Sequence, residues 1–290
     1  SKSLTQRALI CASLAQGRSV VHQPNFGADG RYLIKALQQL GVGLTVSANK
    51  IIVRGTGGKL RVPVQPIDVG DSGANWRFLS ELVPAGTELT GSAQLYRRLK
   101  TIAPTSQTVS GQLLAGKIKR VPTNVVSKGY VAMTQAVITY FAGQGKTYTV
   151  EPDASAATYW QTYNWITGSQ ITFTHWPSTS LQPDYHYSKI LRQLSKGQTV
   201  FDLNTMPDSV MSLAVAAIFT NQTIRIINIP QLTYKESNRL AALHYNLTKL
   251  NIPNTITKDS ITITGTSGKF KRVKIKTFND HRIAMAFGIL

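Results

Sequence analysis

The chain has 290 residues with 42% hydrophobic content, which is enough for one large or two ordinary domains. No apolar run approaches the roughly 18 residues that cross a membrane, and no charged-then-apolar leader opens the chain, so we expect a soluble, cytoplasmic protein. The 32 Lys and Arg residues against 13 Asp and Glu give a net charge of +19, which predicts an anionic partner: nucleic acid, an acidic membrane surface or phosphorylated small molecules.

The first predicted element is a helix that begins within "SKSLTQRAL" (1–9). Lys2, Ser3 and Arg7 lie just before and within it, where free N–H groups and the positive end of the helix dipole make an anion site. Capping of the helix by Ser3 is an equal alternative. Cys11 follows in an apolar run, so we expect a buried thiol, and a single cysteine excludes disulfides and Cys-based metal sites within one chain.

A repeat follows the first helix. The segment "LGVGLTVSANKIIVRG" (40–55) returns as "LNIPNTITKDSITITG" (250–265), each with a strand, a polar turn and a second strand. A helix with apolar residues at i, i+3 and i+4 spacing precedes each copy. Residues 188–200 are similar to the helical half of a third copy. The pattern predicts an α/β fold of two similar domains in which sheets cover helices.

A change of composition near residues 142–152 marks the predicted domain boundary. We therefore expect a first domain at 1–150 and a second at 151–290. Within the first, "GDSGANWRF" (70–78) predicts a glycine turn leading into a helix, with Arg77 one turn inside it. Glycine allows a backbone to approach a phosphate closely, although the turn alone is a weak signal.

Three charged segments follow in the second domain. In "YKESNRL" (234–240) the i, i+4 spacing of Lys235 and Arg239 predicts one shared helix face with Glu236 adjacent. Glu236 is then a helix cap, a member of a surface salt-bridge array or a proton-transfer group in an anion site. The run "KFKRVKIK" (269–276) alternates cations with apolar residues, which favours a solvated strand face over a nucleic-acid patch.

The last charged segment is "FNDHRIAMAF" (278–287), which places polar residues directly before an apolar helix. Asp280 is equally well a helix cap or a catalytic acid. His281 and Arg282 add positive charge at a helix start that already attracts anions.

Metal and serine-nucleophile chemistry are not predicted. The five histidines show no HExxH or paired ligand spacing, and no GxSxG segment is present. The remaining pattern of cations with a few carboxylates suits transfer chemistry on phosphorylated substrates, with electrostatic stabilisation and general acid–base groups.

Six segments in order resemble the signatures of the 3-phosphoshikimate 1-carboxyvinyltransferase (5-enolpyruvylshikimate-3-phosphate synthase) family: "SKSLTQRAL", "GDSGANWRFL", "DASAATYW", "MPDSVM", "YKESNRL" and "FNDHRIAMAF". The resemblance implies two domains of repeated βαβαββ units in an inside-out α/β barrel. It implies transfer of the enolpyruvyl group of phosphoenolpyruvate to the 5-hydroxyl of shikimate 3-phosphate, with release of phosphate. It implies no metal or organic cofactor, and we expect a monomer.

The resemblance also assigns the site residues. Asp208 accepts the 5-hydroxyl proton, Glu236 exchanges a proton with carbon, and Lys2 touches both substrates. The residues matched to shikimate 3-phosphate binding are Ser3, Arg7, Thr105, Ser106, Gln107, Ser127, Tyr130, Gln231 (usually Asn in the family) and Lys235. The residues matched to phosphoenolpyruvate binding are Lys2, Gly73, Arg98, Gln107, Arg239, His281 and Arg282. Cations should keep Glu236 ionised, and bound phosphoenolpyruvate should raise its proton affinity.

The chain departs from the family pattern in four places. Ala74 replaces a threonine, the connection from Arg98 to Thr105 is too short for a whole helix–strand unit, the first signature has no preceding methionine, and Leu290 precedes a late family lysine. We expect an incomplete first domain with residues missing near 99–104, and a second domain without its C-terminal end. A decayed relative is the alternative.

Three other functions remain open on the sequence. A sister transferase acts on UDP-N-acetylglucosamine, but it usually carries a loop cysteine, whereas Cys11 lies in an apolar helix. A basic nucleic-acid-binding protein without catalysis would use the net positive charge. An inactive scaffold would keep the fold alone.

Overall fold

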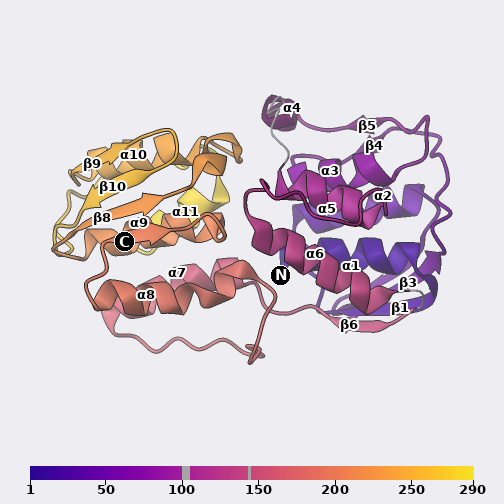
Figure 1. The fold of residues 1–290 in the computed structure, drawn as a ribbon, viewed down its shortest axis with the longest axis horizontal. Coiled ribbons are helices and arrows are strands. Elements are labelled where there is room, and N and C mark those ends of the chain that lie inside the picture. Colours follow the sequence, from indigo (N-terminus) through magenta and orange to yellow (C-terminus); the bar gives the residue numbers. More distant parts are fainter. Residues whose placement is uncertain (100–104, 143–144) are drawn as a thin grey trace. The chain divides into compact units, whose positions relative to one another are not determined.

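The computed structural model describes residues 1–99, 105–142 and 145–290 (Figure 1). The first domain is predicted to lack residues near 99–104, and of these positions 100–104 lie outside the described part of the chain. The described chain divides into unit 1, Ser1–Asp153 with His175–Leu181, and unit 2, Ala154–Thr174 with Gln182–Leu290. This division falls shortly after the predicted boundary, whereas the sequence does not predict that residues 175–181 join unit 1.

Unit 1 combines helices with two sheets. Its helices are α1 (Lys2–Leu14), α2 (Ala28–Gln39), α3 (Gly73–Leu82), α4 (Ala93–Leu99), α5 (Ser106–Leu114) and α6 (Lys128–Phe141). Its strands are β1 (Gln16–His22), β2 (Gly43–Ser47), β3 (Lys50–Thr56), β4 (Ile67–Asp68), β5 (Leu89–Thr90) and β6 (Thr147–Thr149). The larger sheet has the order β2-β3-β1-β6, in which β1 is antiparallel to β3 and parallel to β6.

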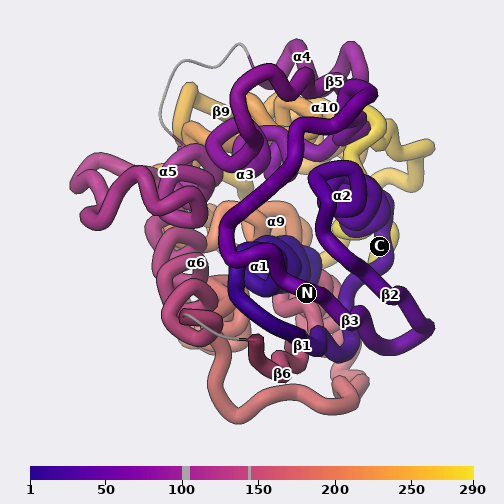
Figure 2. The backbone as a smooth tube through the Cα atoms, turned by 90° about the vertical axis from the view of Figure 1, so that its right-hand side faces the viewer, coloured from indigo at the N-terminus to yellow at the C-terminus, as the bar shows by residue number. Residues whose placement is uncertain are grey.

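Helix α1 runs through the interior of unit 1. Every residue from Leu4 to Ser13 is buried, because the run "RALICASLA" is apolar on nearly all sides of the helix. Figure 2 shows α1 nearly end-on, with α2, α6 and β1 around it. Cys11 is buried here as predicted, and burial raises the pKa of its thiol to about 12, which keeps the thiol protonated at neutral pH.

Unit 2 has a similar composition of elements. Its helices are α7 (Ala154–Thr167), α8 (Tyr187–Ser195), α9 (Val210–Ile218), α10 (Arg239–Lys249) and α11 (His281–Phe287), with short 3₁₀ turns η1 (Pro183–His186), η2 (Pro207–Ser209) and η3 (Pro230–Tyr234). Its strands are β7 (Val200–Asp202), β8 (Thr223–Ile227), β9 (Asn254–Ile256) and β10 (Ile261–Thr264), in the sheet order β7-β8-β10-β9.

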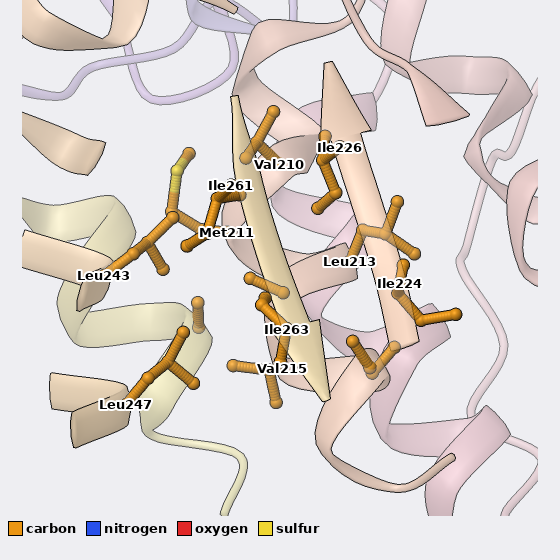
Figure 3. Close-up of a cluster of buried hydrophobic side chains, with 14 of the residues drawn as sticks. Val210, Met211, Leu213, Val215, Ile224, Ile226, Leu243, Leu247, Ile261 and Ile263 are labelled. Atoms are coloured by element: carbon orange, nitrogen blue, oxygen red, sulfur yellow. The ribbon is translucent and has the colours of Figure 1, made fainter. Parts of the chain in front are cut away.

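The core of unit 2 lies between its sheet and the central helix α9, whose residues are all buried. Alternate residues of the strands, Ile224 and Ile226 on β8 and Ile261 and Ile263 on β10, face this core (Figure 3). The period of two along each strand therefore separates the core face from the outer face of the sheet. Within the described part of the chain, no helix combines the length and apolarity needed to cross a membrane.

The predicted repeat is present and is longer than the sequence suggests. The order α1-β1-α2-β2-β3 of unit 1 matches α9-β8-α10-β9-β10 of unit 2, with the same strand pairing. Leu40 and Leu250 end the second helix of each copy, and the next residues, Gly41 and Asn251, both have positive φ (88° and 62°). These left-handed residues stop both helices in the same way.

Gly55 and Gly265 end the repeat for a steric reason. A Cβ at Gly55 would overlap the carbonyl oxygens of Ala12 and Ala15, which close α1, and one at Gly265 would overlap those of Ala217 and Thr220, which close α9. The sheet therefore lies directly on the end of the central helix in both units. Only glycine permits this approach.

Replacing Gly55 or Gly265 by Ala is expected to lower the free energy of unfolding by about 1–3 kcal/mol, because the new methyl group forces the backbone apart. Thermal denaturation followed by circular dichroism measures the change. Gly43→Ala is the matched control, since its Cβ meets only the Arg54 side chain, at 3.2 Å. Equal stability of all three variants would contradict the steric explanation.

The prediction of a strand at 269–276 is wrong. These residues form no ladder with β9 or β10. The segment is held instead by single contacts: the Lys271 N–H donates to Leu250 O (2.9 Å), and the Asn246 side chain bonds both the N–H and the carbonyl of Lys276 (2.9 Å each). The apolar residues of the run still pack on the core while the cations face solvent, which explains why it reads as a strand.

Candidate active site

One buried guanidinium organises the chemistry of unit 2. Arg239 is 1% exposed and donates to three carboxylates: Nη1 to Asp208 (3.0 Å), Nη2 to Glu236 (2.6 Å) and Nε to Asp280 (2.9 Å). Glu236 thus forms a salt bridge, as one interpretation predicted. Its partner Arg239 is buried, however, so the prediction of a surface salt-bridge array is wrong. Asp208 and Glu236, which are distant in the sequence, are held on the same cation.

Two further cations contact Asp208. Arg282 Nη2 donates to Asp208 Oδ2 at 2.7 Å and Arg282 Nη1 to the Tyr159 hydroxyl at 3.4 Å, while Lys235 Nζ lies 4.0 Å from Asp208 Oδ1. Three cations therefore face the three carboxylates around Arg239. An anion bound in this cluster would compete with the carboxylates for these cations.

The local sequence places these groups at helix starts. Asp280 caps α11 by accepting from the Arg282 N–H (2.9 Å), which confirms the predicted cap, and it also accepts from Arg239. Asn238 caps α10 by accepting from the Ala241 N–H (3.1 Å), which makes Arg239 the first helical residue. The predicted helix face shared by Lys235 and Arg239 is therefore wrong, since Lys235 precedes the helix.

The cluster shifts the titration of its members. Burial alone would raise the pKa of Asp280, but the Arg239 guanidinium outweighs it and the pKa is lowered. Burial lowers the pKa of Lys235, with the Asp208 carboxylate acting against that shift. For Arg239, burial is outweighed by Glu236 and the two aspartates, so its pKa is raised and it stays charged.

In unit 1, Lys2 lies at the first turn of α1 between two acids. Its Nζ is 3.1 Å from Asp29 Oδ2, and its backbone N–H donates to Asp153 Oδ2 (2.9 Å). The predicted capping of α1 by Ser3 is wrong, because Ser1 Oγ accepts from the Leu4 N–H. The Ser3 side chain is thereby left out of the cap.

Arg7 lies beneath the residues predicted to bind shikimate 3-phosphate. Its guanidinium is buried and donates to Ser3 O (2.9 Å), Tyr130 O (3.2 Å) and Thr134 Oγ1 (2.7 Å). Burial lowers its pKa to about 10. Among the described residues no carboxylate pairs with Arg7, so an anion bound near Ser3 and Tyr130 would compensate a buried positive charge.

A third group forms around the start of α3. Arg77 Nη1 donates to Gln107 Oε1 (3.0 Å) and lies 3.1 Å from where a Cβ of Gly73 would be. Arg98 Nη2 donates to the carbonyl of Asp71 in the preceding turn. Arg98 and Gln107, from α4 and α5, thus lie near the start of α3 with Gly73, and their shared role in binding stays a prediction.

The other predicted residues also lie at helix starts. Thr105 caps α5 by accepting from the Thr108 N–H (3.2 Å), and Ser106 is the first residue of that helix. Ser127 precedes α6 in a left-handed conformation (φ 58°). In unit 2, Gln231 is buried in η3 and donates to Asn204 O (3.3 Å), whereas the His281 side chain is more than half exposed at the start of α11.

The chain matches the family model EPSP synthase (3-phosphoshikimate 1-carboxyvinyltransferase) over residues 1–99 and 193–290. The chain belongs to this family. The enzyme named 3-phosphoshikimate 1-carboxyvinyltransferase from Nostoc punctiforme is 28% identical over an alignment of 375 residues. The alignment covers 100% of this chain and 87% of the relative. The enzyme of that name from Syntrophobacter fumaroxidans is 29% identical over 375 residues, which cover 100% and 88%.

Solved structures show the same fold. The EPSP synthase from Acinetobacter baumannii superposes with a TM-score of 0.75 at 20% identity, covering 100% of this chain and 86% of that one. The enolpyruvyl transferase NikO from Streptomyces tendae superposes with a TM-score of 0.64 at 12% identity, covering 99% and 85%. The predicted enolpyruvyl transferase fold is thereby confirmed.

Several residues that contact the predicted site residues are missed by sequence reasoning. Arg77 was expected in the helix but not as the partner of Gln107. Asp29 and Asp153 hold Lys2, and Tyr159 bonds Arg282. A signal existed for the acids, because only 13 Asp and Glu are present and Asp153 opens the quoted segment "DASAATYW". No pattern in the sequence marks Tyr159.

Proposed function

We propose that the chain is a 3-phosphoshikimate 1-carboxyvinyltransferase, which transfers the enolpyruvyl group of phosphoenolpyruvate to the 5-hydroxyl of shikimate 3-phosphate and releases phosphate. The family match supports this activity. The single structural observation that carries it is the pair of acids, Asp208 and Glu236, held on the buried guanidinium of Arg239. This arrangement offers two proton-transfer groups in a site built for anions.

Phosphoenolpyruvate would bind where the cations of unit 2 gather. We assign its phosphate and carboxylate groups to Arg239 and Arg282, which in the free cluster pair with carboxylates, and to the neighbouring His281. The arriving anion competes for these cations, so Asp208 and Glu236 lose part of their electrostatic stabilisation. Their proton affinity then rises, which prepares them to accept protons.

The reaction then proceeds by addition and elimination. Asp208 accepts the proton of the 5-hydroxyl while that oxygen bonds to C2 of phosphoenolpyruvate, and Glu236 delivers a proton to C3, which becomes a methyl group. In the second step the C2–O bond to phosphate breaks, and phosphate leaves with the electron pair and with the proton that Asp208 had accepted, so Asp208 is ionised again. Glu236 recovers a proton from the methyl group, which restores the double bond in the product.

We assign shikimate 3-phosphate chiefly to unit 1. The carbonyls of Ser3 and Tyr130 accept from the buried Arg7, whose uncompensated charge favours an anion there, and Ser127 O accepts from the Tyr130 N–H. The helix starts that carry Thr105, Ser106 and Gln107 offer further donors. The family resemblance also assigns Lys235 and Gln231 to shikimate 3-phosphate. Lys2, Gly73 and Arg98 are assigned to phosphoenolpyruvate as well, and Lys2 to both substrates.

The comparisons favour shikimate 3-phosphate over the alternatives. The relatives carry the name of the shikimate enzyme, and none of the observations favours UDP-N-acetylglucosamine or a non-catalytic nucleic-acid-binding role. We further propose a monomeric, cytoplasmic enzyme that needs no metal or organic cofactor. The boundary of the two catalytic domains near residue 150 belongs to the same proposal.

A phosphate-release assay tests the proposed function. We expect the purified chain to release phosphate from phosphoenolpyruvate only when shikimate 3-phosphate is present, and not with UDP-N-acetylglucosamine. Mass spectrometry of the product should show the added enolpyruvyl group. Release with the sugar nucleotide instead, or no release with either acceptor, would overturn the proposal.

A further inference from the structure

A buried carboxylate that the proposed reaction does not use lies beside the cluster. Asp184, in η1, is 1% exposed. Its Oδ1 accepts from Ser209 Oγ and its Oδ2 from Ser155 Oγ, both at 2.5 Å. A buried carboxylate costs more free energy than an apolar side chain of similar size, so its presence calls for a reason beyond packing.

The two serines connect Asp184 to different parts of unit 2. Ser155 lies in the first turn of α7, whereas Ser209 follows Asp208 directly and closes the three-residue turn η2. The backbone of that turn is held by two hydrogen bonds, from the Ser209 N–H to Met206 O (3.0 Å) and from the Val210 N–H to Pro207 O. Hydrogen bonds to a carboxylate are short and strong, so Asp184 ties η2 to η1, the turn in which Asp184 itself lies.

The electrostatic surroundings agree with this arrangement. Burial raises the pKa of Asp184, and the negative charge of Asp208 raises it further, while Arg282 and the two serine hydroxyls act in the opposite direction. Asp184 therefore senses the same arginine that bonds Asp208. The two carboxyl groups belong to one connected polar network.

We propose that Asp184 is a positioning residue for Asp208: through Ser209 it ties the turn that aims the Asp208 carboxylate to η1, and its second bond, to Ser155, is not required to hold that turn. The inference rests on the proposed function, because Asp208 matters only as the group that accepts the hydroxyl proton. A displaced carboxylate would still bind Arg239 and Arg282 but would transfer the proton less well.

A matched pair of variants tests the proposal. Ser209→Ala and Ser155→Ala each remove one 2.5 Å hydrogen bond to Asp184, but only Ser209 adjoins Asp208. We expect Ser209→Ala to lower kcat about tenfold with little change in either KM, and Ser155→Ala to change kcat by less than about threefold. Similar melting temperatures would show that both variants fold. Equal loss of kcat in both, or no loss in Ser209→Ala, would overturn the proposal.

Variants of Asp184 give a second test. Asn keeps an oxygen that accepts from one serine and an amide group that donates to the other, so Asp184→Asn should keep kcat within about threefold, whereas Asp184→Ala should lose at least as much as Ser209→Ala. Adding Ser209→Ala to Asp184→Ala should lower kcat no further, because the bond is already absent. Additive losses would contradict the link.

Hydrogen exchange separates this inference from the proposed function. In Ser209→Ala the backbone amide of residue 209 should exchange about tenfold faster than in Ser155→Ala, because η2 opens more easily. If the wild type releases no phosphate, the proposed function fails, while the exchange rates still decide whether Asp184 holds the turn. Equal exchange in both variants would show that it does not.

Discussion

Glu236→Gln is expected to lower kcat by about 10²–10⁴-fold, because the amide cannot deliver a proton to C3 or recover it. Binding of both substrates should be nearly unchanged. The Gln side chain keeps an oxygen that can accept from Arg239 Nη2, the bond that Glu236 makes at 2.6 Å. Steady-state phosphate release measures kcat and both KM values.

Glu81→Gln is the matched control for this variant. Glu81 also pairs with a cation, Lys117 at 2.9 Å, but it lies in α3, outside the carboxylate cluster of unit 2. We expect its kcat to stay within about twofold of the wild type. Near-normal turnover of Glu236→Gln would refute the acid–base role, whereas equal losses in both variants would point to a general effect of losing a paired charge.

Arg239→Met is expected to destabilise the protein by about 3–5 kcal/mol and to abolish turnover. The substitution leaves Asp208, Glu236 and Asp280 without the guanidinium that holds them, and Asp280 has no access to solvent. Arg282→Met is the control, because Arg282 also pairs with Asp208 but is less buried than Arg239. Urea denaturation should show a larger loss of unfolding free energy for Arg239→Met than for Arg282→Met. Equal losses would contradict the central place of Arg239 in the carboxylate cluster.

This destabilisation should depend on pH. The lowered pKa of folded Asp280 means that its ionised form adds stability above the ordinary aspartate pKa of about 3.9, and that this stability is lost as the pH falls toward the lowered value. The variant lacks that contribution. The difference between wild type and Arg239→Met should therefore be largest near neutral pH and narrow below about pH 4, and a constant difference would rule out the Asp280 pair as its source.

The sequence predicts most of the fold because its repeat is local. Apolar spacing and turn residues mark the helix, strand, turn and strand of both copies, and the structure has them in both units. The error at 269–276 has a physical cause: alternation only states which side chains face the core, and here Asn246 and Leu250 bond the backbone in place of a neighbouring strand. Periodicity cannot distinguish a segment that pairs with a neighbouring strand from one whose backbone bonds to residues such as Asn246 and Leu250.

The sequence predicts which residue types form the candidate site, but not which of these residues contact one another. A carboxylate among cations marks Glu236, and the structure confirms that it meets Arg239. The central place of Arg239 is not predictable. The sequence suggests a helix face shared with Lys235 or a surface salt-bridge array, whereas the burial of Arg239 depends on Asp208 and Asp280, which are distant in the chain. The role of Asp184 is not predictable for the same reason, because both of its serine partners lie in other segments of the chain.

The central claim is that Glu236 exchanges a proton with the carbon of phosphoenolpyruvate while Asp208 accepts the hydroxyl proton. Turnover in deuterated water with both substrates tests it most directly. The account predicts deuterium in the vinyl group of the product and of recovered phosphoenolpyruvate for the wild type, and none above background for Glu236→Gln within the time of several wild-type turnovers. Phosphate release by the wild type with no deuterium in the enolpyruvyl group would contradict it.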